Sequence, residues 1–277
     1  MAFVLGGGGN LGAVQVGMLR ALLEHRIVPD LVVGCSVGAL NGAAFAQEPN
    51  FVGIARLEQL WQTLEGKDVM PSGWFTAVHL ARRGVSVRDN TRLRRVIEGI
   101  LAADRFEDLQ IPFQCVATDL VAAKEVWFDR GALLEPILAS SAIPAMFPPV
   151  DIDGVRYLDG AVVNDIPVSR AVELGARRIY VLHVGSFDRP LPEPKRPIDV
   201  AVQAYWIARR HRFYRDIATL PKGVEVVVLP TGEPPRIAFH DFTRSEQLIA
   251  NAYAASHAYL EAAAADLPAA GSVAVHD

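Results

Sequence analysis

The sequence predicts an α/β fold in which helices cover a mostly parallel central sheet. Short apolar runs that end at glycine, at residues 2–5 and 31–33, are typical of buried strands. Each is followed by a segment of helical character, with apolar residues at helical spacing in 13–26 and small apolar residues in 39–46. This β-α-β-α order favours parallel strands that are buried on both faces.

The alternation continues along the rest of the chain. Further strands are expected at residues 111–118, 125–128, 155–158, 178–184 and 224–229. Further helices are expected at 51–64, from the N-cap Asp89 to 101, and at 133–140, 168–174, 199–220 and 243–265. We expect loops at 141–150 and 190–197, an irregular stretch at 71–84 and a frayed tail from 268. No linker divides the chain, so a single domain over 1–277 is expected.

Composition excludes several classes of function. The chain has 277 residues, of which 51% are apolar and 21% charged, so it can bury a sizeable core. Its net charge of -4 argues against a nucleic-acid partner. Cys35 and Cys115 are too few for a disulfide framework or a four-cysteine zinc site. With no signal peptide and no apolar run of roughly 18 residues, we expect a cytoplasmic protein, and a peripheral membrane contact stays open.

A glycine-rich loop follows the first predicted strand. From Gly7 it reads G-x-G-x-x-G, the pattern of a dinucleotide-binding loop. Such a site also needs an acidic residue at the carboxyl end of the second strand. Here Asp30 precedes that strand, which puts it at the wrong end of the sheet. The sequence therefore argues against a dinucleotide.

The second predicted strand is followed by a G-x-S-x-G motif. Ser36 lies between Gly34 and Gly38, and a helix is predicted to begin near Val37. Strand, turn and helix in this order are the context of a nucleophile elbow, and helix N–H groups favour a developing anion there. An incidental serine in a strand-to-helix turn is the alternative. If Ser36 is a nucleophile, the glycine loop at the same sheet edge can supply oxyanion donors, because glycine N–H groups are unshielded.

Two further motifs identify the chain as similar to a known family. Residues 140–149 read SSAIPAMFPP, and residues 157–167 read YLDGAVVNDIP. Together with the glycine loop and G-x-S-x-G, in this order over residues 3–184, they resemble the patatin-like phospholipases. The resemblance implies a three-layer α/β/α sandwich, a lipid or fatty-acyl ester substrate and no metal or other cofactor.

The resemblance also implies a Ser–Asp dyad in place of a Ser-His-Asp triad. Ser36 would be the nucleophile and Asp159 the general base and acid, followed by Gly160 and Ala161 of the D-G-[GA] motif. The N–H groups of Gly7, Gly8 and Gly9 would form the oxyanion hole. Because a carboxylate is a weak base unless burial raises its pKa, we expect Asp159 to be buried beside Ser36. Three nearby carboxylates are interpreted as unrelated to catalysis: Asp151, Asp153 and Asp165.

The glycine loop departs from the family pattern at one position. The family usually has Arg or Lys where this chain has Leu11. Leu11 has no charge with which to orient the loop or to favour an oxyanion. Cys35 and Val37 narrow the space around Ser36, and Cys35 is interpreted as a packing residue.

Three other functions remain open from the sequence. A Ser-His-Asp esterase could recruit one of four histidines: His183, His211, His240 or His257. An acyltransferase would use the same residues with an acceptor other than water. A non-catalytic lipid-binding relative would have kept only the fold.

Two segments are candidates for contact with lipid. Residues 72–80 are aromatic and flanked by glycine, which is typical of a lid or of an ordinary loop with a buried aromatic residue. Residues 206–215 mix arginines with aromatic residues on a predicted helix. We interpret the arginines Arg209, Arg210 and Arg212 as a solvated face, with contact to an anionic membrane as the alternative.

Overall fold

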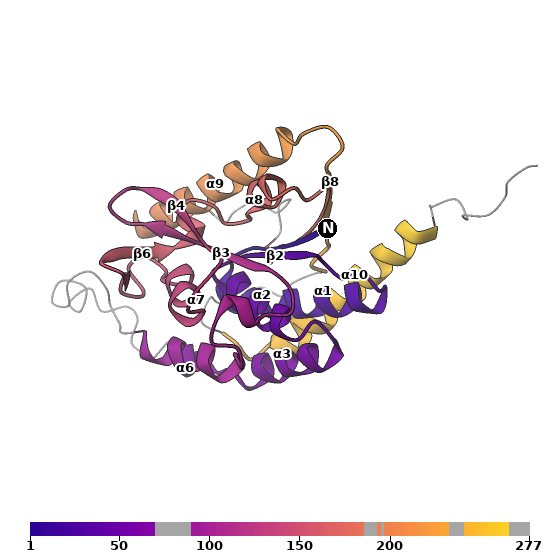
Figure 1. Ribbon diagram of the computed structural model, residues 1–277, viewed down its shortest axis with the longest axis horizontal. Coiled ribbons are helices and arrows are strands. Elements are labelled where there is room, and N and C mark those ends of the chain that lie inside the picture. The colour runs from indigo at the N-terminus through magenta and orange to yellow at the C-terminus, as the bar shows by residue number, and fades with distance from the viewer. Residues whose placement is uncertain (70–89, 186–192, 195–196, 233–240, 266–277) are drawn as a thin grey trace, which may run out of the picture.

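The computed structural model describes residues 1–69, 90–185, 193–194, 197–232 and 241–265, and shows a central sheet between layers of helices (Figure 1). The sheet has the order β5-β6-β3-β2-β1-β7-β8, and β4 pairs with β3. Its strands are β1 (Ala2–Leu5), β2 (Leu31–Cys35), β3 (Phe113–Asp119), β4 (Lys124–Phe128), β5 (Val150–Ile152), β6 (Val155–Asp159), β7 (Arg178–Leu182) and β8 (Glu225–Val228). The strands β1, β2, β3, β7 and β8 form parallel pairs, whereas β4, β5 and β6 pair antiparallel.

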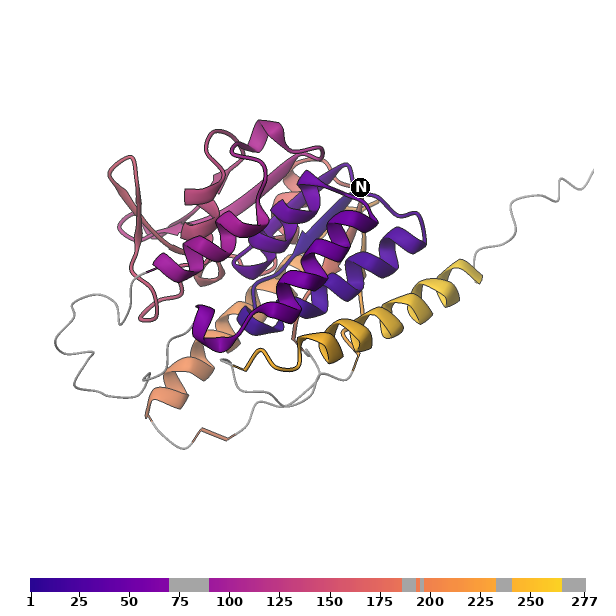
Figure 2. The same cartoon turned by 90° about the horizontal axis from the view of Figure 1, so that it is seen from below.

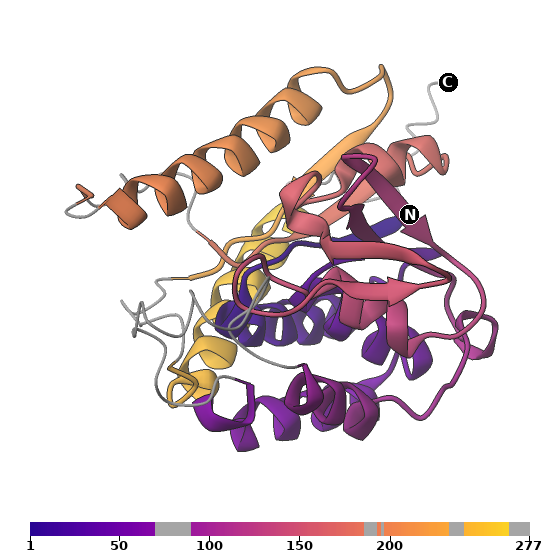
Figure 3. The ribbon, with the colours of Figure 1, turned by 90° about the vertical axis from the view of Figure 1, so that its left-hand side faces the viewer.

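Helices cover both faces of this sheet. They are α1 (Ala13–Glu24), α2 (Val37–Gln47), α3 (Phe51–Thr63), α4 (Gly66–Val69), α6 (Thr91–Ile100), α7 (Leu134–Ser140), α8 (Val168–Glu173), α9 (Pro197–Ala218) and α10 (Ser245–Ala265). Short 3-10 turns are η1 (Gly9–Gly12), η2 (Phe106–Asp108) and η3 (Gly160–Val162). Figure 3 shows α8 and α9 on one face and α1, α2, α3, α6, α7 and α10 on the other. The predicted α/β class is therefore confirmed.

The apolar strands are explained by burial on both sides. In β1, Phe3 and Leu5 belong to the core beneath α1 and α2, while Ala2 and Val4 belong to the core beneath α8 and α9. Successive side chains of a strand point to opposite faces. A strand between two helical layers must then be apolar at every position, which is why residues 2–5 show no alternation.

The structure differs from the sequence prediction at the antiparallel side of the sheet. The strand β5 begins at Val150, the last residue of a segment expected to be a loop, and forms a hairpin with β6. Prolines are rare in strands, so the prolines of that segment favoured a loop and the short edge strand at its end was not predicted. The irregular stretch at 71–84, the N-cap Asp89, much of 190–197 and the tail from 268 lie outside the described residues.

Close approach of two helices requires one glycine. Figure 2 shows α10 (yellow) running alongside α1 and α3, and α1 packs against α10. A β-carbon at Gly17 in α1 would lie 2.2 Å from the carbonyl oxygen of Ile249 and 2.7 Å from the backbone nitrogen of Tyr253, both in α10. Because both contacts are with backbone, no side chain can move aside to make room.

We therefore expect Gly17→Ala to lower the free energy of unfolding by about 1–3 kcal/mol, as overpacking does in a tight core. Gly99→Ala is the matched control in α6, because a β-carbon there meets nothing within 4 Å. Helix propensity predicts that the control is neutral or stabilising by less than about 1 kcal/mol. Urea unfolding followed by circular dichroism measures both. Equal stability of the two variants would contradict the close approach of α1 and α10.

Candidate active site

The position of the candidate site is fixed by two strands that share one edge of β3. β2 runs parallel to β3 and ends at Cys35, opposite Val116, whereas β6 runs antiparallel to β3 and ends at Asp159, opposite Ala117. β4 pairs with β3 across both of these positions, so β4 occupies the other edge. β2 and β6 therefore run toward each other, and the residue after β2, Ser36, meets Asp159.

Ser36 lies in a sharp turn between β2 and α2. Its φ of 54° and ψ of −124° are unusual for a residue with a side chain. A β-carbon at Gly34 would lie 2.5 Å from the carbonyl oxygen of Gly38, and one at Gly38 would lie 2.2 Å from that of Leu5. The Ser36 amide donates to Ser140 Oγ at 2.9 Å, which ties the turn to the end of α7. The turn has the strand–turn–helix geometry that a nucleophile elbow requires.

The side chains of Ser36 and Asp159 are joined by a short hydrogen bond. Ser36 Oγ donates to Asp159 Oδ2 at 2.6 Å, and the amide of Ala161 donates to Asp159 Oδ1 at 2.8 Å. Thr118 Oγ1 donates to the backbone carbonyl of Asp159 at 2.8 Å. Gly160 is required next to this residue, since a β-carbon there would lie 2.3 Å from the carbonyl oxygen of Val116. Both carboxylate oxygens thus have fixed partners.

Burial sets the protonation of this pair. Asp159 is 2% exposed and Ser36 is 5% exposed. Loss of solvent raises the pKa of the Asp159 carboxyl to about 6, although the hydrogen bonds from Ser36 and Ala161 oppose the rise. The carboxylate is therefore a stronger base than an exposed aspartate and is still mostly ionised at neutral pH. Burial also raises the pKa of the neighbouring Cys35 thiol, which stays protonated.

The glycine loop passes directly over Ser36. A β-carbon at Gly7 would lie 3.2 Å from Ser36 Cβ, and one at Gly8 would lie 1.8 Å from Val184 Cγ2. The amide of Gly7 donates to the backbone carbonyl of Asp165 at 3.1 Å. Among the described residues, no backbone carbonyl accepts a hydrogen bond from Gly8 or Gly9. Of the three expected donors, the Gly7 amide is thus already engaged.

A buried polar network beneath the loop was not found from the sequence. Gln15 Nε2 donates to the carbonyl oxygen of Gly6 at 2.7 Å, and its Oε1 accepts from Asn41 Nδ2 at 2.9 Å. Asn41 Nδ2 also donates to the carbonyl of Gly12 at 3.0 Å, and Asn41 Oδ1 accepts from Trp61 Nε1 at 3.0 Å. Both ends of the loop are therefore held by side chains of α1 and α2. The sequence signal that could have indicated this network is the presence of Gln15 and Asn41 within otherwise apolar helices.

The interpretation of Arg209 as part of a solvated face was wrong. Arg209 was expected on a solvated or membrane-facing surface, but its side chain is buried and pairs with the carboxylate of Asp165, which is also buried. Arg212 lies on the same side of α9 and pairs with Asp216 at 3.0 Å. The sequence does not predict this burial, because a run of arginines on a helix does not indicate which of them face the protein interior. Leu11 packs against the apolar core instead of facing the pair.

Four histidines had been considered as alternative bases. His257 lies in α10, where it hydrogen-bonds to His25 with 2.8 Å between ring nitrogens. His211 is on the exposed side of α9, and His240 lies outside the described residues. His183 is buried just after β7. The partner of Ser36 Oγ within the described part of the chain is Asp159.

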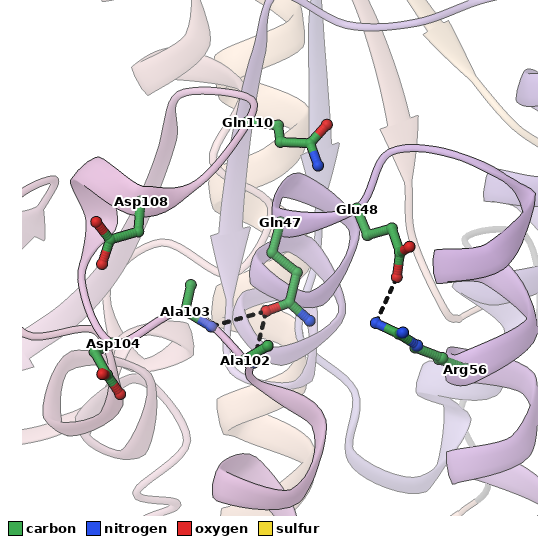
Figure 4. A pocket seen from close by; sticks show the side chains of 8 residues that line it. All are labelled: Gln47, Glu48, Arg56, Ala102, Ala103, Asp104, Asp108 and Gln110. Carbon is green, nitrogen blue, oxygen red and sulfur yellow. Dashed lines mark hydrogen bonds and ion pairs between the residues drawn. The ribbon is translucent and has the colours of Figure 1, made fainter.

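The hollow in Figure 4 lies away from this site. It has a volume of about 420 Å³ and is lined mainly by polar groups, including Gln47, Glu48 and Arg56. Gln47 is the last residue of α2, so the hollow lies about 16 Å along the helix from Ser36. Gln47 Oε1 accepts from the amides of Ala102 and Ala103, and Arg56 pairs with Glu48 at 2.6 Å. The hydrogen bonds of Gln47 anchor the chain after α6 to the end of α2.

The described residues show neither a metal site nor a helix that could span a membrane. They contain no cluster of three or more His, Cys, Asp or Glu side chains arranged to hold a metal ion. Within the same residues, every helix is too short or too polar to cross a lipid bilayer.

Known proteins resemble this chain in sequence and in fold. Over 190 residues, 68% of the chain, it is 34% identical to patatin-like phospholipase domain-containing protein 7 of Rattus norvegicus. Over 191 residues it is 32% identical to neuropathy target esterase sws of Drosophila melanogaster, and over 193 residues 30% identical to lysophospholipase nte1 of Aspergillus terreus. The chain spans only 12–14% of the length of these relatives. The crystal structure of VipD from Legionella pneumophila shares the fold, with a TM-score of 0.57 at 14% identity, covering 95% of this chain and 67% of that one.

A family model extends this likeness to the motifs. The model of the patatin-like phospholipases matches residues 3–172. The match includes the glycine loop, Ser36 and Asp159, and ends before α9 begins. The chain belongs to the patatin-like phospholipase family.

Proposed function

We propose that this chain hydrolyses acyl ester bonds of lipids, with Ser36 as the nucleophile and Asp159 as the base. One observation carries the proposal: the 2.6 Å hydrogen bond from Ser36 Oγ to a buried carboxylate, at a turn that presents Ser36 at the start of α2. A serine oxygen becomes a nucleophile when an adjacent base takes its proton. A pKa of about 6 suits Asp159 to that role near neutral pH.

In the first half-reaction, Ser36 Oγ forms a bond to the ester carbonyl carbon while its proton moves to Asp159. The carbonyl π electrons move onto the oxygen, which becomes an oxyanion. When the tetrahedral intermediate collapses, the bond to the leaving alcohol breaks and Asp159 returns the proton to that alcohol. The product is an acyl ester on Ser36.

In the second half-reaction, water takes the place of the alcohol. Asp159 accepts a proton from the water as its oxygen bonds to the acyl carbon. Collapse of the second intermediate releases the fatty acid, and the proton returns to Ser36 Oγ. If an alcohol enters here in place of water, the same steps transfer the acyl group to that alcohol. The acyltransferase alternative therefore uses the same residues and stays a prediction.

The oxyanion donors in this proposal are the amides of Gly8 and Gly9. Hydrogen-bond donors aimed at the developing charge are worth roughly 10²–10³ in rate each. A contribution from Gly7 would require its amide to leave the Asp165 carbonyl that it binds at 3.1 Å. The amino-terminal end of α2 adds a favourable dipole at the same place.

The substrate class is inferred from the family. One relative is named a lysophospholipase and another an esterase, which supports a single-chain acyl ester as substrate. Because a lipid substrate lies in a membrane or micelle, a peripheral contact with such a surface is part of the proposal.

A direct test combines labelling with turnover. Wild type, Ser36→Ala and Asp159→Asn are treated with a fluorophosphonate probe and assayed on p-nitrophenyl esters and lysophosphatidylcholine. We expect Ser36→Ala to lose labelling and hydrolysis, and Asp159→Asn to lose at least 10³-fold in kcat, as in other enzymes that lose a positioned base. Asp151→Asn is the matched control, because this carboxylate is exposed and accepts a hydrogen bond from the Gly154 amide, away from Ser36, so its replacement should leave activity unchanged. Hydrolysis that survives in Asp159→Asn but is lost in His183→Gln would refute the dyad.

The pH dependence follows from the protonation of Asp159. Only the ionised carboxylate can take the proton of Ser36, and its pKa is about 6. We expect kcat/KM for p-nitrophenyl butyrate to fall tenfold per pH unit below about 6 and to be flat above it. This fall of kcat/KM at low pH, the acid limb of the profile, should persist in His183→Gln. A limb that stays near pH 4 would mean that the Asp159 carboxylate is not the base.

The same burial predicts a cost in stability. Between the pKa of the unfolded chain, about 4, and the folded value of about 6, the folded state binds more protons, so stability falls as pH rises. Above pH 6 the loss is complete, on the order of 2–3 kcal/mol. Asp159→Asn should therefore gain stability over wild type as pH rises from 4 to 6, with a constant difference above that. Thermal unfolding at pH 4.5, 6 and 7.5 measures this without any substrate, and a difference that is independent of pH would contradict the burial of a charged Asp159.

A further inference from the structure

The helix α9 has an unusual distribution of side chains. Val200, Ile207 and Tyr214, spaced seven residues apart, are exposed to solvent. Arg209 and Arg212 turn the other way, toward η3 and α8. A surface helix usually turns apolar side chains toward the core. The helix α9 does so with Phe213, but it also turns Arg209 inward. Cationic groups are inside here, so their role must be sought in what they contact.

The Arg209 side chain lies between a carboxylate and two aromatic rings. Its side chain is 8% exposed and pairs with Asp165, which is 11% exposed. The guanidinium lies over the ring of Trp206, 4.4 Å from its centroid, and 5.2 Å from that of Tyr205. A buried guanidinium is tolerated where a carboxylate and aromatic faces replace water. This arrangement fixes Arg209 in one position.

Asp165 connects Arg209 with the glycine loop. The Asp165 backbone carbonyl accepts the hydrogen bond from the Gly7 amide at 3.1 Å. A β-carbon at Gly7 would lie 2.6 Å from Asp165 Oδ1, 3.4 Å from Arg209 Nη2 and 3.2 Å from Ser36 Cβ. The ion pair, the loop and the nucleophile therefore meet at Gly7. The place is too narrow for any residue with a side chain.

The uncharged Leu11 gives the contact of Arg209 with the glycine loop a larger role in the electrostatics of the loop. With Leu11 packed in the core, the loop itself carries no cationic side chain from Gly6 to Gly12. The charge next to the loop comes instead from α9, more than thirty residues beyond the matched family region, which ends at 172. Arg209 therefore places next to the loop the positive charge that residues 6–12 lack.

We propose that Arg209 is a positioning residue of this active site, which acts through Asp165 to hold the Gly7 end of the glycine loop against Ser36. The proposal rests on the proposed function, because it concerns the same nucleophile. It assigns α9 a part in catalysis without any contact between Arg209 and the reacting atoms. Misplacement of an oxyanion donor by about 1 Å costs roughly 10²-fold in rate.

The ion pair also acts electrostatically on Asp159. The groups that act on this carboxylate come from several elements: the Ser36 hydroxyl, the Ala161 amide, the Cys35 thiol, Tyr205, Arg209 and Asp165. The positive charge of Arg209 lowers the pKa of Asp159, and the negative charge of Asp165 raises it. Removing one member of the pair should therefore move the acid limb of the pH profile up or down, according to which charge is left.

The test compares Arg209→Met, Asp165→Asn and the double variant with wild type on p-nitrophenyl butyrate. We expect each single variant to lose 10- to 100-fold in kcat while KM changes less than threefold. The acid limb should move to higher pH in Arg209→Met and to lower pH in Asp165→Asn. The double variant should return the limb to near the wild-type pH but keep the low kcat. Its folding is protected because no charge is left buried alone.

Controls separate this role from general damage. Arg215→Met removes an exposed arginine from the same helix and should change neither kcat nor the limb. Arg209→Lys keeps the charge but not the planar fork, so it should restore the limb more fully than kcat. The proposal is overturned if Arg209→Met and the double variant both keep kcat within twofold of wild type.

A second readout does not depend on turnover. In amide NMR spectra, Arg209→Met should shift the Gly7 resonance, because its hydrogen bond to Asp165 changes, while Arg215→Met leaves it in place. If wild type hydrolyses no ester and takes no fluorophosphonate label, the proposed function fails, and this measurement still decides the inference. An unshifted Gly7 resonance in Arg209→Met would overturn it.

Discussion

The shared edge of β3 is the constraint on which this site depends. Two strands that approach each other along one edge must stop where they meet, and here they stop at Cys35 and Asp159, opposite consecutive residues of β3. Around the meeting point, close backbone contacts leave no space for a β-carbon at three positions, which accounts for Gly34, Gly38 and Gly160. The hydrogen bond between Ser36 and Asp159 is thus a consequence of register. A shift of either strand by one residue would turn the facing side chains to the other side of the sheet.

The same geometry explains the electrostatics. A carboxylate at the end of a buried strand loses most of its solvent. Within the described residues, the donors that replace water at Asp159 are the Ser36 hydroxyl, the Ala161 amide and, at 3.9 Å, the Cys35 thiol. Solvation is then incomplete, so the pKa rises and the folded state pays in stability. A fully solvated aspartate would be stable but too weak a base. The site therefore combines a destabilising charge with a rigid sheet, and the large apolar cores on both faces offset it.

Local features of the site could be predicted from the sequence, and long-range ones could not. The elbow at Ser36 is a local property, because glycine spacing and the strand–helix order are visible within a few residues. Asp159 followed from the family resemblance alone, since an Asp-Gly pair is otherwise a common turn. The ion pair of Arg209 with Asp165 joins residues 44 positions apart, and no spacing rule connects them. The same is true of Gln15 and Asn41, whose partners are the carbonyls of the loop.

The placement of Arg209 bears on how the fold is completed after its common core. The matched region ends after the start of α8, yet the groups nearest Gly7 include an arginine from α9. A loop of glycines has few side chains with which to hold itself, and its backbone freedom has to be removed from outside. Gln15 and Asn41 do this from one face of the sheet, and Asp165 with Arg209 does it from the other. Contacts from both helical layers hold the loop. If Arg209 positions the loop as proposed, variation in the second layer can tune the proposed reaction without any change at Ser36 or Asp159.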